Sequence, residues 1–173
     1  FASTLIPFAF AMGGMMTGKI KEWTAFASPW SFFGVMVLGT GILMGGAWAY
    51  EALSFGGFWA WDPVENASLV PWLTFVGAAH VMLINKKNGT ALLSSFLLTV
   101  ATFILILYST FLTRSGILGD TSVHAFTDLG MTGQLVVYMV FFVIQAIWLW
   151  FINRSEEHTS ELQSHSFISY AVF

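Results

Sequence analysis

The 173-residue sequence contains no cysteine, and only 9% of its residues are charged. Without cysteine it forms no disulfide, holds no metal through a thiolate and has no cysteine nucleophile. Little charge combined with 57% hydrophobic residues and a mean hydropathy of +0.76 excludes a water-soluble globular domain. The composition indicates a membrane protein whose chemistry rests on His, Asp, Glu and aromatic side chains.

Five apolar stretches recur along the chain, at about residues 2–16, 30–50, 66–84, 91–112 and 131–152. Each approaches the roughly 20 residues that a helix needs to cross a bilayer. Backbone groups in lipid must be satisfied within the segment, which favours helices over strands. We therefore predict an all-α, polytopic transmembrane helix bundle of about five spans. Phe1 opens within an apolar run, without a basic segment or a cleavage site, so we expect a fragment of a longer chain.

The charged residues of the connections predict which loops share a side. The first and third connections carry lysines, at Lys19, Lys21, Lys86 and Lys87. The second and fourth carry Glu51, Asp62, Glu65, Asp120 and Asp128, with Arg114 as their one cation. Because short loops rich in Lys and Arg stay cytoplasmic, we expect two outward loops, the second and the fourth.

The second loop ends in the signature of a helix start. In Asp62-Pro63-Val64-Glu65, Asp62 is placed as the N-cap, Pro63 as the first helical residue, and Glu65 as the residue that reaches back to the N-cap amide. Both carboxylates also suit the positive end of the helix dipole. This capping role explains the acidic residues without any ligand.

Capping does not explain the aromatic residues of the same segment. Two glycines, Gly56 and Gly57, lie among five aromatic residues: Phe55, Phe58, Trp59, Trp61 and Trp72. An aromatic belt at the lipid headgroups is one interpretation. The other, which we favour, is a platform for a planar and largely apolar ligand, with the glycines allowing close approach to the backbone.

The fourth loop, residues 113–130, contains His124, the one histidine of the two outward loops. Neutral imidazole is a common metal ligand and an axial ligand of haem iron, although a loop histidine is also an ordinary surface residue. Arg114 can pair with a ligand carboxylate, with Asp120 or with Asp128, or it can extend to the membrane interface.

His80 lies inside a predicted span. If its helix starts at Pro63, His80 is about 25 Å along it; if the crossing starts near Pro71, the depth is about 14 Å. An ionisable side chain at either depth is costly, which makes His80 a functional candidate. The alternative is a neutral histidine hydrogen-bonded to a neighbouring helix.

Three segments carry a family resemblance. FGGFWAWDPVENASLVPWL resembles the tryptophan-rich WWD signature of haem-handling membrane proteins, while FLTRSG and SVHAF resemble a second segment of the CcmF/NrfE branch. The resemblance covers residues 1–153, a transmembrane cytochrome c assembly domain. It implies haem b held by the WWD loop and outward histidines, with His124 as one iron ligand, and a second, membrane-embedded haem b with His80 as a ligand. Phe55 and Phe58 stand where tryptophan is typical, so indole N–H donors are lost there.

The same resemblance implies a function at the periplasmic face of the bacterial inner membrane. Haem would come from the chaperone CcmE and be joined to an apocytochrome c presented by subunits of the CcmH/CcmI type, as a cytochrome c haem lyase does. The haem on His80 would keep the periplasmic iron ferrous. The lipid bilayer is a further expected partner, and nucleic acid is not. A haem exporter, a b-type quinol oxidoreductase and a structural scaffold are the alternative functions.

The last twenty residues, 154–173, depart from the apolar pattern. The run RSEEHTSELQSHSFISYAVF resembles the translation of a common sequencing adapter. We therefore expect this segment to be non-native and assign no function to its histidines and glutamates.

Overall fold

The computed structural model describes residues 1–52, 57–119, 121–122 and 130–170, with side chains through residue 152. The described chain forms five helices, α1 (Ala2–Met16), α2 (Trp23–Glu51), α3 (Pro63–Asn88), α4 (Leu92–Arg114) and α5 (Thr132–Tyr170). Within these ranges there is no strand, which confirms the predicted all-α class.

Four of the described helices are long and apolar enough to cross a membrane: α2, α3, α4 and the Thr132–Ile152 part of α5. The 15-residue α1 is shorter. Three helices extend well beyond the predicted apolar stretches: α2 begins at Trp23, α3 runs from Pro63 to Asn88, and α5 continues to Tyr170. Hydropathy marks the part of a helix that suits lipid, whereas caps and end residues set where the helix itself begins and stops.

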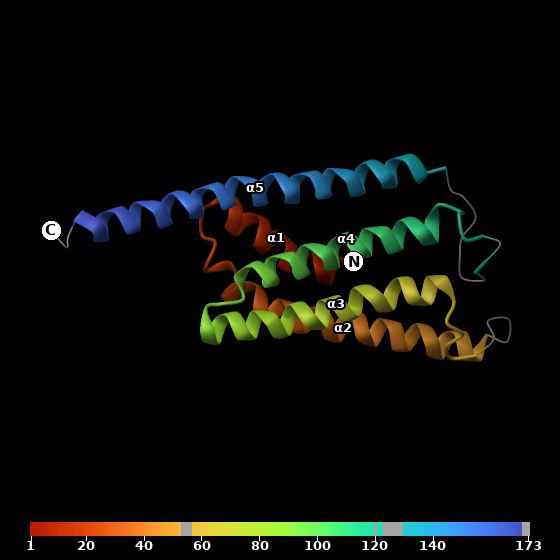
Figure 1. Ribbon diagram of the computed structural model, residues 1–173. Coiled ribbons are helices and arrows are strands. Elements are labelled where there is room, and N and C mark those ends of the chain that lie inside the picture. The colour runs from red at the N-terminus through yellow and green to blue at the C-terminus, as the bar shows by residue number, and fades with distance from the viewer. Residues whose placement is uncertain (53–56, 120, 123–129, 171–173) are drawn as a thin grey trace.

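The helices lie side by side in chain order, α2 on α3, α3 on α4 and α4 on α5 (Figure 1). The short α1 packs against α2, α4 and α5. Its Phe8 ring stacks on Phe103 of α4, with ring centroids 4.2 Å apart and planes inclined by 24°. Twelve buried residues form this core: Phe8, Ala11, Met12, Met15, Trp23, Ala27, Met82, Phe96, Phe103, Leu107, Ala146 and Leu149.

Polar side chains also join neighbouring helices. Trp72 of α3 donates its indole N–H to the carbonyl of Val35 in α2, at 3.0 Å. The hydroxyls of Thr102 in α4 and Thr74 in α3 are 3.1 Å apart. Interhelical hydrogen bonds of this kind are a main source of specificity between membrane helices, where lipid and side chains are equally apolar.

The second and fourth connections lie at the same end of the bundle (Figure 1). The last turns of α2 and α4 and the first turns of α3 and α5 surround this end, which we call the loop end. The first connection, which carries Lys19 and Lys21, and the third connection, which follows Lys86 and Lys87 in the last turn of α3, lie at the other end (Figure 1). The two acidic loops thus lie at one end of the bundle, as the charge distribution of the sequence predicts.

Candidate functional site

The first turn of α3 builds one wall of the loop end. The Asp62 carboxylate accepts a hydrogen bond from the Val64 amide at 2.8 Å. Glu65 Oε2 accepts from the Asp62 amide at 3.1 Å, which completes the predicted capping box, with Pro63 in the first turn. The helix start predicted from the sequence is confirmed.

The chain that leads into α3 has two unusual backbone positions. Gly57 has φ +125° and Trp61 has φ +57°. A residue with a side chain would be strained at this φ, so the backbone conformation alone explains why position 57 is a glycine, without any ligand. Trp61 thus has a backbone conformation that residues with a Cβ rarely adopt.

The predicted aromatic residues divide between an exposed group and a packed one. Trp61 and Phe58 are exposed, and the rings of Trp59 and Trp61 meet edge to face, with centroids 6.1 Å apart. Trp72 packs on α2 instead, close enough to Gly39 that a Cβ there would be 2.8 Å from its Nε1. Its indole N–H is already bonded, so Trp72 holds α3 against α2; its contact with a ligand stays a prediction.

Phe58 fixes the loop to α2 through a glycine. A Cβ on Gly46 would lie 2.9 Å from the Phe58 carbonyl oxygen and 3.0 Å from its ring. Only a glycine allows this approach of backbone to helix. At Phe58, the described part of the loop before α3 is thereby packed on the last turns of α2.

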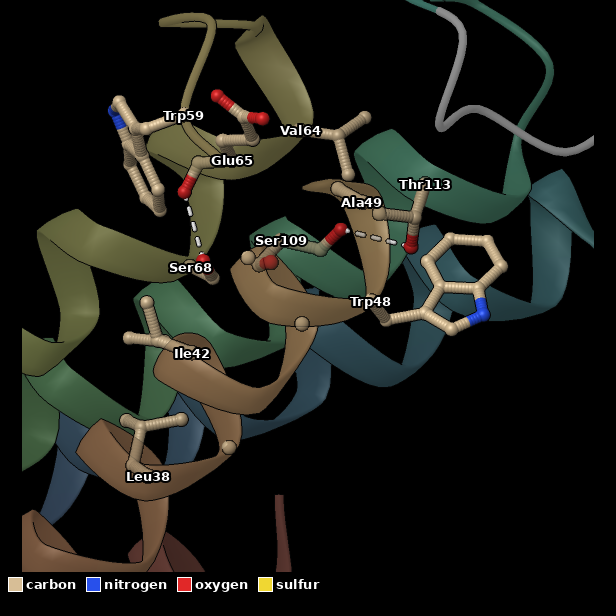
Figure 2. Close-up of a pocket in the computed structure, with 13 residues that line it drawn as sticks. Leu38, Ile42, Trp48, Ala49, Trp59, Val64, Glu65, Ser68, Ser109 and Thr113 are labelled. Carbon is tan, nitrogen blue, oxygen red and sulfur yellow. Dashed lines mark hydrogen bonds between the residues drawn. The ribbon is translucent and has the colours of Figure 1, made fainter. Parts of the chain in front are cut away.

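A cavity of about 330 Å³ opens between α2, α3 and α4 below this loop (Figure 2). Its volume is at the lower end of the range for small-molecule sites. The lining comes from Leu38, Gly41, Ile42, Gly45, Gly46, Trp48 and Ala49 of α2, Trp59, Val64, Glu65 and Ser68 around the start of α3, and Ser109 and Thr113 of α4. Trp59 and Trp48 are drawn on opposite sides of it (Figure 2).

The polar groups of the lining are largely committed to their own helices. Ser68 donates its hydroxyl to the Glu65 carbonyl at 2.7 Å, and Thr113 donates to the Ser109 carbonyl at 3.1 Å (Figure 2). Glu65 accepts two backbone N–H groups. Because these groups do not depend on water in the cavity, its interior suits an apolar ligand.

Among the described residues, a hydrogen bond joins the second and fourth connections. Ser122 in the fourth connection donates its hydroxyl to Asp62 Oδ1 at 2.6 Å, across 60 positions of sequence. Ser122 is buried, and it stands two residues before His124. This contact brings the segment that leads to His124 against the start of α3.

Some predicted site residues lie outside the described residues. These are Phe55, Gly56 and His124, together with Asp120 and Asp128, the two carboxylates considered as partners of Arg114. Arg114 itself is exposed at the last residue of α4. Their roles stay predictions, and in the part of the chain that is described no group of three or more His, Asp or Glu side chains can hold a metal ion. A single axial imidazole needs no such group.

His80 is exposed on α3, far from the loop end. Its Nδ1 lies 2.7 Å from the Val76 carbonyl oxygen of the same helix, and the ring meets Phe32 of α2 at 5.8 Å. A carbonyl only accepts, so Nδ1 is the donor in this contact, and a neutral imidazole in that tautomer keeps the lone pair that can bind a metal on Nε2. Because α3 is one continuous helix from Pro63, His80 is about 25 Å from its first residue, which favours the deeper of the two predicted placements. The bond goes to its own helix rather than to a neighbouring one.

Sequence reasoning missed several residues of the loop end. Ser122 carries no local signal, since its partner is distant in the sequence. Gly41 and Gly45, spaced one helical turn apart with Gly46 beside them, give a weak signal for a face that something approaches closely. Asn66, whose side-chain amide donates to the Trp61 carbonyl at 3.0 Å, follows the capping box directly.

Residues 9–118 match the family model described as Cytochrome C assembly protein. The chain is 39% identical over 140 residues to the cytochrome c-type biogenesis protein CcmF of Pseudomonas fluorescens, covering 80% of this chain and 21% of that protein. It is 35% identical over 160 residues to CcmF of Escherichia coli K12, covering 92% of this chain and 24% of that protein. NrfE of Haemophilus influenzae is 41% identical over 118 residues, which cover 68% of this chain and 18% of that protein. The chain thus spans about a fifth of the length of these relatives. No solved structure matches it.

Proposed function

Because this chain belongs to the cytochrome c assembly protein family and its relatives are of the CcmF and NrfE type, we propose that its loop end binds haem during cytochrome c biogenesis. The long apolar helices and these relatives make it part of a multi-pass membrane protein. The observation that carries the proposal is the hydrogen bond between Ser122 and Asp62, which joins the two loops that the site requires.

The cavity under the WWD loop is the place that we propose for one edge of the haem. It is small, apolar in its interior and bordered by Trp59, whose indole can lie against a flat ring. Trp61, beside Trp59, extends the aromatic surface outward. His124, two residues beyond the anchored Ser122, is the proposed axial ligand, and Arg114 is the proposed partner of a haem carboxylate.

The haem in this site is cargo for ligation to an apocytochrome c. In that reaction a thiol adds across a vinyl double bond: a sulfur–carbon bond forms, the π bond breaks and the thiol hydrogen ends on the terminal vinyl carbon. No oxidant or reductant is consumed. The residues of the loop end would act by orienting the porphyrin toward the thiols, an effect that reaches about 7–11 kcal/mol in favourable systems. CcmE as haem donor and CcmH/CcmI-type subunits as presenters of the apocytochrome remain part of this proposal, as does a loop end facing the periplasm across a bacterial inner membrane.

His80 fits a second, resident haem b in the membrane. Its proton lies on Nδ1, held by the Val76 carbonyl, and its exposed position on α3 leaves room for a ligand and a second helix. Haem b there would supply one-electron chemistry when bound. The chain's own contribution is to fix the tautomer and the orientation of this imidazole.

Replacing each histidine by alanine in the full-length protein tests the two sites separately. His124→Ala should lower the haem that co-purifies and stop c-type cytochrome formation, while a membrane b-type spectrum persists. His80→Ala should remove that spectrum. Unchanged haem and unchanged cytochrome in His124→Ala would reject the proposed function. Exporter and scaffold functions predict that outcome, since neither needs iron ligation by this loop. Of the two histidines, a quinol oxidoreductase would need only His80.

A further inference from the structure

Trp61 has a positive φ, +57°, the one such value for a residue other than glycine in the described parts of the chain. A side chain with a Cβ is strained in this left-handed region and stays there only when its surroundings hold it. Trp61 is also 70% exposed, and its ring meets Trp59 only edge to face, so packing of its own ring supplies little of that support. Hydrogen bonds to the neighbouring backbone supply the rest.

Three hydrogen bonds hold the backbone around Trp61, two of them on the peptide unit that joins Trp61 to Asp62. Glu65 Oε2 accepts from the amide of Ala60 at 2.9 Å and from the amide of Asp62 at 3.1 Å, one before and one after Trp61. Asn66 donates its side-chain amide to the Trp61 carbonyl at 3.0 Å. A capping box alone requires only the bond to Asp62. The other two bonds run from α3 side chains to the Ala60 amide and the Trp61 carbonyl, in the backbone just before the helix.

We propose that Glu65 and Asn66 are positioning residues that hold Trp61 in the left-handed conformation, so that its indole projects beside Trp59 as the outer wall of the haem site. This inference rests on the proposed function. The left-handed residue turns the chain immediately before α3, and the two rings meet at 86°. Trp59 lines the cavity, while Trp61 stands outside it. The conformation therefore determines how far the aromatic surface extends.

A double-mutant cycle on haem affinity in the purified full-length protein tests whether Glu65 acts through Trp61. Glu65→Ala should weaken haem binding roughly three- to tenfold, the range that loss of one aromatic contact gives. Glu65→Gln keeps a side-chain oxygen as acceptor and should bind close to wild type. Trp61→Gly removes the ring and tolerates the positive φ. Adding Glu65→Ala to Trp61→Gly should then change affinity little.

Because Glu65 also lines the cavity, its loss could act on haem directly. In that case Glu65→Ala would weaken binding equally with and without Trp61, and the inference would be overturned. Asn66→Asp, which removes the donor to the Trp61 carbonyl without changing size, provides an independent arm, since Asn66 is absent from the cavity lining. It should weaken haem binding in wild type and have little effect in Trp61→Gly.

A haem-free measurement separates this inference from the proposed function. Trp61→Cys should react rapidly with a membrane-impermeant maleimide, and adding Glu65→Ala should change the rate of that reaction, whereas labelling of Thr121→Cys stays unchanged. Equal labelling of Trp61→Cys with and without Glu65 would overturn the inference. Failure of the wild-type protein to bind haem would overturn the proposed function, and the labelling would still decide the role of Glu65.

Discussion

Asp62 is the residue on which the two loops converge. One carboxylate oxygen accepts from the Val64 amide at 2.8 Å and from the Ser122 hydroxyl at 2.6 Å. Hydrogen bonds to a charged acceptor are short and stronger than neutral ones. The side chain that starts α3 therefore also anchors the approach to His124.

Ser122→Ala should loosen this anchor without removing the cap of α3. A hydrogen bond to a charged group is worth about 1.5–3 kcal/mol, so we expect haem affinity of the full-length protein to fall about tenfold or more. Titration of the purified protein with haem measures the change. Thr121→Ala is the matched control, because Thr121 is exposed and bonds only to the Leu118 carbonyl among described contacts. If both variants bind haem alike, the anchor has no part in the site.

For single residues, the sequence predicts contacts between residues that are close together in the chain. The roles of Asp62 and Glu65 follow from a capping rule that spans four residues, and the structure confirms them. The bond to Ser122 joins positions 60 apart, and the left-handed Trp61 depends on Asn66 and Glu65 together. The bond to Ser122 exists only after the helices have packed. The bonds around Trp61 are local, but neither hydrophobic periodicity nor the capping rule describes them.

Among the helices, α2 determines how closely its neighbours approach. Its glycines fall into two groups. Gly34, Gly39 and Gly46 face Phe75, Trp72 and Phe58, and a Cβ at any of them would lie less than 3.0 Å from those residues. Gly41 and Gly45 have nothing within 4 Å, and both line the cavity.

Gly39→Ala should separate α2 from α3 at Trp72. The added methyl would lie 2.8 Å from the indole nitrogen and compete with its bond to the Val35 carbonyl. Overpacking of this kind typically costs about 1–3 kcal/mol. The free energy of unfolding in detergent measures it. Gly45→Ala is the control on the same helix, where the open space predicts no loss and a gain of up to about 1 kcal/mol from helix propensity. Equal stability of the two variants would contradict this packing.

The sequence predicts where the helices lie more accurately than where they begin and end. The apolar stretches locate all five helices, but α2 starts seven residues before its predicted stretch and α3 continues past it through Lys86 and Lys87 to Asn88. Gly89, with φ +71°, ends α3. Hydropathy does not detect such ends, because polar residues continue a helix into water.

For the whole molecule, the arrangement of charges implies which loops share a compartment. Both acidic connections lie at the loop end, and Lys86 and Lys87 lie near the opposite end of α3 (Figure 1). The distribution of lysines predicts this without any structure. The cavity, in contrast, needs the packing of three helices and is not predictable from any one of them.

Labelling from one side of the membrane tests this topology. The chain contains no cysteine, so single substitutions are informative once any cysteine elsewhere in the full-length protein is replaced. A membrane-impermeant maleimide added outside should label Ala60→Cys and Thr121→Cys and should not label Lys87→Cys until the membrane is opened. Labelling of Ala60→Cys and Thr121→Cys from opposite sides would contradict the shared loop end.

The central claim is that the cavity between α2, α3 and α4 receives haem, and filling that cavity tests it most directly. Gly45 lines it with open space around its Cα, so Gly45→Leu should occupy the cavity while leaving the helix packing intact. Gly13→Leu, on α1 and also with nothing within 4 Å, is the control outside the cavity. We predict that haem titration of the full-length protein gives an affinity at least about tenfold weaker for Gly45→Leu and unchanged for Gly13→Leu, at equal thermal stability. Unchanged haem affinity in a stably folded Gly45→Leu protein would contradict the account.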